Sequence, residues 1–206
     1  MTTLFDSSFV CSVCGETSEF QVIGSTNAFG PNDLDMRPPE MQRSTMPYWV
    51  QECPKCGYVA DSIDEEFKLD RSFLTSESYA TCDGRRFANK LAERFYRAYL
   101  IAKALDDKEL AFHRLMSAVW SCDDAKDVKN ARECRVVAAD LAGELGDLRD
   151  YAVIRADILR RAGLFDKVVE EYSNFHSERE ILEKVVAFHV KAAREKDDRR
   201  HTSADV

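Results

Sequence analysis

The sequence predicts a mostly helical α+β protein, with a small N-terminal ribbon built on cysteine knuckles ahead of an antiparallel helical stack. Three observations predict this class. Two Cys-x-x-Cys-Gly motifs and all five prolines lie within the first 60 residues, and no proline follows. From about residue 64 apolar residues recur with the period of an α-helix. We predict a ribbon domain at 1–63, a helical domain at 64–196 and a disordered polar tail at 197–206.

Composition sets broad limits on the class of protein. The chain has 206 residues, of which 45% are hydrophobic and 32% charged, which is enough to bury a core. No apolar run reaches the roughly 20 residues that span a bilayer, and the N-terminus lacks the basic and apolar regions of a secretory signal. We therefore expect a cytoplasmic protein without membrane contact. In that reducing compartment seven cysteines indicate metal ligation or burial, not disulfides.

Short strands are expected in the ribbon. Residues 19–24 and 48–53 alternate β-branched or aromatic residues with polar ones. The segment between them, 25–46, is too long for a turn and contains the stiff step Arg37–Pro38–Pro39. We expect it to form an ordered excursion that packs on the ribbon.

The paired motifs read CSVCG at 11–15 and CPKCG at 53–57. Two residues between the cysteines let both sulfurs face one centre, and the following glycine permits a turn that points backbone N–H groups at sulfur. The long spacer is tolerable because loop-closure cost grows only logarithmically with length. The predicted metal ligands are Cys11, Cys14, Cys53 and Cys56.

The metal is expected to be Zn²⁺, with iron as the alternative. Four thiolates leave no open coordination position, so a zinc site of this kind stabilises a fold and does no chemistry. Rubredoxins present similar paired knuckles, and their tetrathiolate iron carries electrons. This chain has Glu16–Thr17–Ser18 where the tyrosine and aspartate-proline run of rubredoxins usually follows the first knuckle. A large helical domain is also foreign to a simple electron carrier, so zinc is favoured.

The ribbon segment is acidic. Residues 1–62 hold three basic and eight acidic side chains, a net charge of −5 in a chain of net charge −8. Nucleic-acid binding depends on neutralising phosphates with basic side chains. The charge therefore argues against nucleic acid as a partner.

Apolar periodicity predicts a series of helices after the ribbon. Glycines mark two of the expected ends, Gly146 and Gly163. The predicted helices cover about 87–102, 110–120, 128–145, 148–159, 166–175 and 178–194. Within them, residues 156–173 resemble half of a tetratricopeptide repeat, although Val168 replaces the usual alanine and no second copy lies 34 residues upstream. A helical hairpin stack without repeat ancestry is the alternative.

A basic stripe follows one side of the first long helix. Arg86, Lys90, Arg94 and Arg97 recur at i, i+4, i+8 and i+11. One interpretation is intramolecular: the acidic ribbon docks on this helix and the stripe offsets its charge. The other is a binding surface for a protein or an acidic or phosphorylated peptide. We favour the first interpretation and keep the four residues as candidate partner-binding residues.

The layout resembles a bacterial domain family of unknown function that pairs two Cys-x-x-Cys-Gly knuckles with tetratricopeptide-like helices. The resemblance rests on residues 11–15, 33–37, 47–60 and 113–120. It implies the architecture and the four cysteine ligands, but no activity. It also implies a structural cluster around the ribbon, formed by Asp35, Arg37, Tyr48 and Trp49.

No catalytic constellation stands out in the sequence. The favoured function is a non-enzymatic zinc protein that uses its helical stack as a protein-interaction or scaffold module. The alternative is a rubredoxin-like iron electron carrier with a helical docking domain. A third hypothesis, an enzyme that uses Asp33 and Asp35 in the acidic loop, lacks a matched base or nucleophile.

Overall fold

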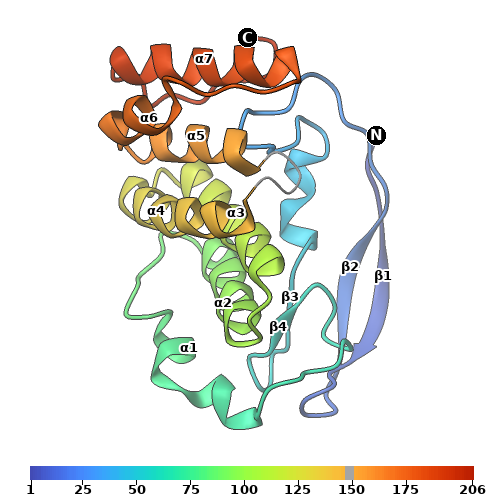
Figure 1. Ribbon diagram of the computed structural model, residues 1–206. Helices are drawn as coiled ribbons and strands as arrows, with labels where there is room; N and C mark the ends of the chain where they lie inside the picture. Colours follow the sequence, from blue (N-terminus) through green and yellow to red (C-terminus); the bar gives the residue numbers. More distant parts are fainter. Residues whose placement is uncertain (147–150) are drawn as a thin grey trace.

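Two antiparallel β-hairpins and two short 3₁₀ helices form the N-terminal part of the chain (Figure 1). The computed structural model describes residues 1–146 and 151–206. The first hairpin consists of β1 (Thr3–Val10) and β2 (Thr17–Ser25), and the second of β3 (Gln51–Glu52) and β4 (Val59–Ala60). The 3₁₀ helices are η1 (Arg43–Tyr48) and η2 (Arg71–Thr75).

Helices make up most of the remaining chain, and consecutive long helices pack against one another as a stack (Figure 1). In the described part they are α1 (Glu77–Thr81), α2 (Lys90–Ala104), α3 (Lys108–Asp124), α4 (Val128–Leu145), α5 (Tyr151–Arg161), α6 (Phe165–Tyr172) and α7 (Glu180–Arg194). None of these is long and apolar enough to cross a membrane. A mostly helical fold with a small N-terminal hairpin confirms the broad class that the sequence predicts. The tetratricopeptide relationship stays a prediction.

The α2–α3 turn and the α3–α4 turn have the same structure, a left-handed residue followed by an aspartate that caps the next helix. Asp106 and Lys126 adopt the left-handed conformation, with φ of 56° and 58°, and so end the preceding helix. The next residue, Asp107 or Asp127, caps the following helix by accepting a hydrogen bond from the backbone N–H three residues later. Such tight turns fold consecutive helices back on each other, which accounts for the antiparallel stack.

The ribbon and the helices share one hydrophobic core. Val59 and Ile63, which follow the second cysteine knuckle, are buried in the same cluster as Phe95 and Tyr99 of α2. Strand β4 contacts α2 directly. Residues on both sides of the predicted domain boundary at residue 63 therefore belong to one continuous core. Whether the two parts fold as separate units stays a prediction.

The C-terminal segment lies against the loop that follows β2. The Leu34 N–H donates to the His201 carbonyl at 3.0 Å, and the Ser203 N–H donates to the Asn32 carbonyl at 2.9 Å. An isolated β-bridge joins Asp33 to Thr202 at the same place. These contacts differ from the disorder expected for residues 197–206, because pairing across the whole length of the chain gives the segment backbone partners that a local pattern does not contain.

Most predicted elements correspond to observed ones. The strand expected at 19–24 is β2, and the helix expected at 128–145 is α4, capped by Gly146. The strand expected at 48–53 is reduced to two residues by η1, and β1 was not predicted. The start of the helix expected at 148–159 lies partly outside the described residues; the described part begins at Tyr151.

Candidate metal centre

The first knuckle is a tight turn at the end of β1. Gly15 has φ of +71°, a backbone conformation that L side chains rarely adopt, and its N–H donates to the Cys11 carbonyl at 2.8 Å. The Cys11 N–H in turn donates to the Glu16 carbonyl at 2.8 Å. A Cβ built on Gly15 meets nothing within 4 Å, so the backbone conformation and not crowding explains the glycine.

The second knuckle repeats this geometry between β3 and β4. Gly57 has φ of +72°, and its N–H donates to the Cys53 carbonyl at 2.9 Å. The Cys53 N–H donates to the Tyr58 carbonyl at 2.8 Å. The two predicted knuckles are therefore the same structure built twice, 42 residues apart in their first cysteines.

The two knuckles face each other and bring four sulfur atoms together. The ligand atoms of Cys11, Cys14, Cys53 and Cys56 all lie within 4.8 Å of one another. The Sγ atoms of Cys11 and Cys56 are 3.6 Å apart, as are those of Cys14 and Cys53. A tetrahedral site with metal–sulfur bonds of about 2.3 Å places its sulfurs about 3.8 Å apart. The arrangement can hold one metal ion, and the predicted set of cysteines is the set that converges.

Burial disfavours the charged thiolate form of two of these cysteines. Cys11 and Cys53 are almost fully buried, whereas Cys14 and Cys56 are half-buried. Burial raises the pKa of Cys11 and of Cys56 because it removes water from the charged form. A bound divalent cation would supply the missing stabilisation of the thiolates.

The four-cysteine cluster lies where three segments meet. The Ser12 N–H donates to the Ile63 carbonyl at 2.9 Å, and the Tyr79 hydroxyl of α1 donates to the Gly57 carbonyl at 2.7 Å. At the surface Lys55 of one knuckle forms an ion pair with Glu16 beside the other, at 3.1 Å. The cysteines thus join the β1–β2 hairpin to the second hairpin and, through it, to the helices.

The other cysteines lie elsewhere in the fold. Cys82, Cys122 and Cys134 are buried, and among the described residues only the four knuckle cysteines form a group with metal-ligand spacing. Burial raises the pKa of Cys134 to about 12, which is typical of a core thiol and not of a reactive one.

The basic stripe divides into two halves. Arg94 and Arg97 both bind Glu52 of β3, each at 2.9 Å, and Arg97 also stacks over the ring of Tyr79. Arg86 and Lys90 are exposed. Arg94 and Arg97 therefore join the ribbon to α2, as the intramolecular interpretation expects. Partner binding by the exposed half stays a prediction.

Replacing Arg94 and Arg97 together with alanine should lower the free energy of unfolding by about 1–2 kcal/mol. Both arginines share one partly buried carboxylate, and networks of this kind stabilise more than isolated surface pairs. Urea unfolding of the double variant measures the loss. The matched control is the double alanine variant of Arg86 and Lys90, for which a change below about 0.5 kcal/mol is expected. Equal losses in both variants would contradict a joining role specific to Arg94 and Arg97.

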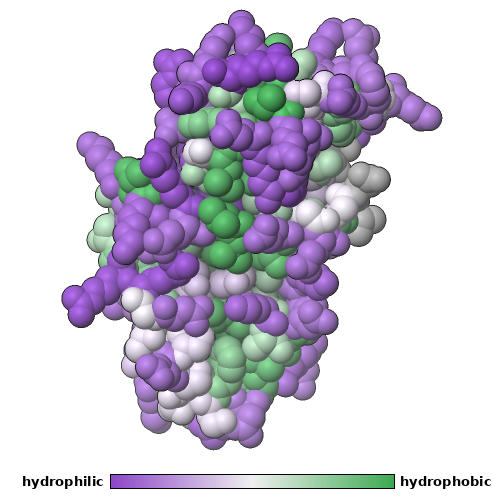
Figure 2. Space-filling view, turned by 60° about the vertical axis from the view of Figure 1, so that its left-hand side comes forward, coloured by the Kyte–Doolittle hydropathy of each residue, from purple (hydrophilic) through white to green (hydrophobic). Residues whose placement is uncertain are grey.

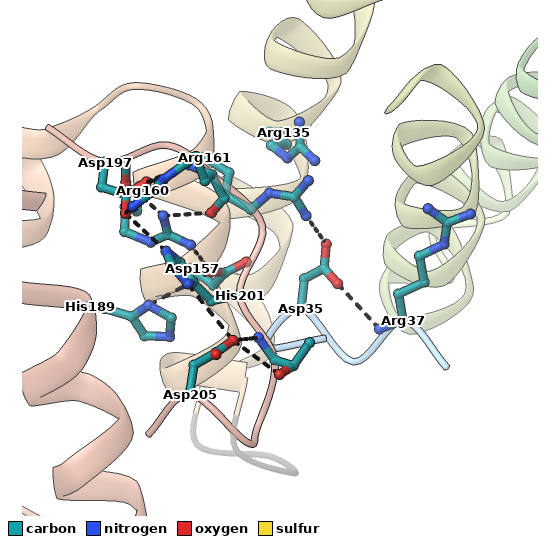
Figure 3. Close-up of polar contacts among 12 residues, drawn as sticks. Asp35, Arg37, Arg135, Asp157, Arg160, Arg161, His189, Asp197, His201 and Asp205 are labelled. Carbon is teal, nitrogen blue, oxygen red and sulfur yellow. Dashed lines mark hydrogen bonds and ion pairs between the residues drawn. The ribbon is translucent and has the colours of Figure 1, made fainter. Parts of the chain in front are cut away.

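A second cluster of polar residues is buried under the loop after β2 (Figure 3). One oxygen of Asp35 accepts hydrogen bonds from Trp120 Nε1 at 3.0 Å and from Arg161 Nη1 at 2.6 Å. The other accepts from the Arg37 N–H at 3.2 Å. The Arg37 guanidinium points away from Asp35 and binds Asp124 at the end of α3. The loop is therefore tied to α3 and α5 by charges.

This arrangement places two members of the predicted cluster, Asp35 and Arg37, against the helices. Asp35 and Arg37 contact the helices and not the metal centre, and the indole N–H of Trp49 donates locally to Thr45 Oγ1 at 2.9 Å. The contacts of this loop with the helices were missed because they connect residues 85 or more positions apart. The one signal available was the presence of acidic and basic residues in a segment with stiff prolines.

The enzyme hypothesis gains no support from this loop. Asp33 and Asp35 are each 2% exposed, and both carboxylates form ion pairs with arginines, Asp33 with Arg43 at 2.7 Å. The two side chains border different hollows of the surface. Their geometry is that of structural charge pairs.

A buried histidine lies beside this cluster on α7. His189 is fully buried, and its Nδ1 is 3.7 Å from an oxygen of Asp157, which also accepts from Arg160 at 2.6 Å (Figure 3). Burial lowers the pKa of His189 to about 4, partly opposed by Asp157 and reinforced by Arg160. The imidazole is therefore neutral in the folded protein at neutral pH.

The depressed pKa of His189 makes acid destabilise the fold. The unfolded chain takes up a proton near pH 6.5 and the folded chain only near pH 4, so stability is complete above pH 6.5 and falls as pH drops between these values. The loss should reach about 3 kcal/mol, and His189→Phe should remove it. Urea unfolding at pH 7 and pH 4.5 measures this. His176→Phe, at a site 88% exposed, is the control and should keep the wild-type pH dependence.

Comparisons with known proteins add no family. No protein-family model matches the chain, and the searches of curated proteins and of solved structures found no significant similarity. The resemblance to a knuckle-and-helix family therefore stays a prediction.

Proposed function

We propose that this chain is a non-enzymatic, cytoplasmic zinc protein whose metal centre fastens the N-terminal hairpin to a helical interaction module. The observation that carries the proposal is the convergence of four cysteine sulfurs within 4.8 Å of one another at the junction of these parts. Four thiolates saturate a tetrahedral ion, so the metal's role is to hold the fold together. The residues that follow the second knuckle are part of the core shared with the helices, so a metal bound by the four cysteines would stabilise the whole fold.

Cobalt substitution tests the ligand set. Co²⁺ added to metal-free protein should give the intense visible bands of a tetrahedral thiolate complex, saturating at one ion per chain, and Zn²⁺ should displace it. Cys14→Ser should weaken these bands and shift them, whereas Cys122→Ser should leave them unchanged. Saturation at another ratio, or bands that survive Cys14→Ser, would contradict the proposed centre.

The helical stack is the proposed partner surface. A band of hydrophobic atoms runs down the face seen in Figure 2, between hydrophilic margins. The exposed half of the basic stripe, Arg86 and Lys90, supports an acidic peptide as the ligand class. Arg86 lines a surface hollow of about 470 Å³ beside α1, together with Arg85 and Phe87.

A labelled glutamate-rich peptide is the probe for this surface. Its fluorescence anisotropy should rise on binding the zinc-loaded protein, and alanine at both Arg86 and Lys90 should weaken binding about tenfold. Alanine at Arg132, an arginine on α4 whose side chain is 50% exposed, should change the affinity little. Equal binding by both variants would remove the exposed stripe from the proposed function.

A further inference from the structure

Strand β1 is an unprotected edge of the N-terminal hairpin. In the described part of the chain its backbone pairs with β2 alone, and Figure 1 places β1 at the outer margin of the molecule. It is eight residues long, with the sequence TLFDSSFV. A strand of this length presents a row of unpaired N–H and C=O groups to the outside.

The side chains of β1 do not block pairing with another strand. Edge strands are commonly protected by proline, lysine or several charges, and here Asp6 is the single charged residue. Leu4, Phe5 and Val10 are 37%, 54% and 56% exposed. Phe5 is paired with Val22 of β2, and its ring lies over Gly24, where an added Cβ would be 3.2 Å from the ring. The exposed edge is thus both apolar and held in strand conformation.

We propose that β1 pairs with β1 of a second copy of this chain, antiparallel about a two-fold axis at Ser7, to form a four-stranded sheet. An isolated two-stranded hairpin is marginal in water, and a wider sheet stabilises it. A closed two-fold contact uses the same strand on both copies, so it requires a sequence that is complementary to itself when reversed.

The sequence of β1 has this complementarity in one register. Centring the axis on Ser7 places Leu4 opposite Val10, Phe5 opposite Phe9 and Asp6 opposite Ser8 of the second copy. Centring it on Asp6 would place the two Asp6 carboxylates opposite each other, which is unfavourable. A two-fold axis between Asp6 and Ser7 is excluded, because it would place these two residues opposite each other on one face of the sheet, whereas neighbours in a strand lie on opposite faces. The separation of the two Asp6 carboxylates and the pairing of apolar side chains therefore both favour an axis at Ser7.

The proposed pairing of β1 strands should stop at a dimer. The remaining edge of each hairpin is β2, and η1 contacts β2 within the same copy. The four-stranded sheet would therefore end at the two β2 strands instead of continuing into a fibre. A dimer of defined size, and not open-ended growth, is the expected product.

Light scattering of the full metal-loaded chain, combined with size exclusion, tests the proposal. The mass should be twice the chain mass of 23.5 kDa. Leu4→Glu and Val10→Lys should each weaken the dimer about tenfold or more, because each change occurs twice across the axis. The double variant should recover a dimer affinity within about threefold of wild type, because the introduced carboxylate of one copy then faces the introduced ammonium group of the other.

This rescue is specific to the proposed register, because residues 4 and 10 lie at opposite ends of one strand and do not meet within one copy. The control introduces the same charges on β2, as Ile23→Glu with Thr17→Lys, and should leave the dimer intact. Zinc content is measured for every variant to establish that the knuckles are intact. A monomeric wild-type chain, larger assemblies, or failure of the double variant to dimerise with zinc retained would overturn the proposal.

Discussion

Cys53→Ser is expected to cost the protein its metal and at least about 3 kcal/mol of unfolding free energy. Cys53 is 1% exposed, and its knuckle connects β3 to β4 and the shared core. Metal binding by structural thiolate sites contributes directly to folding free energy, by about 10–16 kcal/mol in small zinc-binding peptides. The helical core supplies part of the stability here, so the loss is a fraction of that range.

Metal analysis and urea unfolding of Cys53→Ser measure both effects. Cys122→Ala is the matched control, because it removes a fully buried thiol outside the cluster. It should retain the metal and lose about 1–2 kcal/mol, the cost of a small cavity. A Cys53→Ser protein as stable as this control would mean that the ribbon does not depend on its metal.

Asp35→Ala is expected to destabilise the protein by about 2–4 kcal/mol. The substitution removes one of the two carboxylates that bind the Arg161 guanidinium, leaving Asp123 at 2.7 Å, and it leaves the Trp120 N–H without an acceptor. The loss is costly because a buried charge keeps only part of its compensation and a buried donor is left unpaired. The loop after β2 should lose its ion pair with α5, while Arg37 still joins it to Asp124 of α3.

Thermal and urea unfolding measure the Asp35→Ala effect. Asp198→Ala removes the partner of Arg132 from a half-exposed pair of 2.6 Å and should cost below about 1 kcal/mol. Replacing Asp35 and Arg161 together with leucine should cost less than the sum of the two single changes, because both members of one direct ion pair are then removed together. Additive losses would contradict a direct pair.

Local patterns in the sequence were sufficient to predict the metal ligands. Each knuckle is built within five residues, so spacing and glycine placement determine its geometry. The same locality explains why α4 and its end at Gly146 match the structure: an apolar stripe of period 3.6 and one glycine define them.

The remainder depends on contacts between distant residues. Strand β1 was missed because Leu4 and Phe5 are adjacent apolar residues and two serines follow, so the alternation of a half-buried strand is broken. The order of the C-terminal segment depends on pairing with residues near position 33. Asp35 looks like a surface loop residue in the sequence, and only the fold brings Arg161 to it across 126 positions.

Metal analysis with a visible absorption spectrum, on protein purified without added metal, distinguishes structural zinc from redox-active iron in the cysteine cluster. We expect one zinc per chain and a colourless sample, as a closed tetrathiolate site at the junction of the ribbon and the helices requires. Stoichiometric iron with a reducible red colour would contradict it and make electron transfer the function to pursue. A fully folded protein without any metal would contradict the proposed role of the four cysteines.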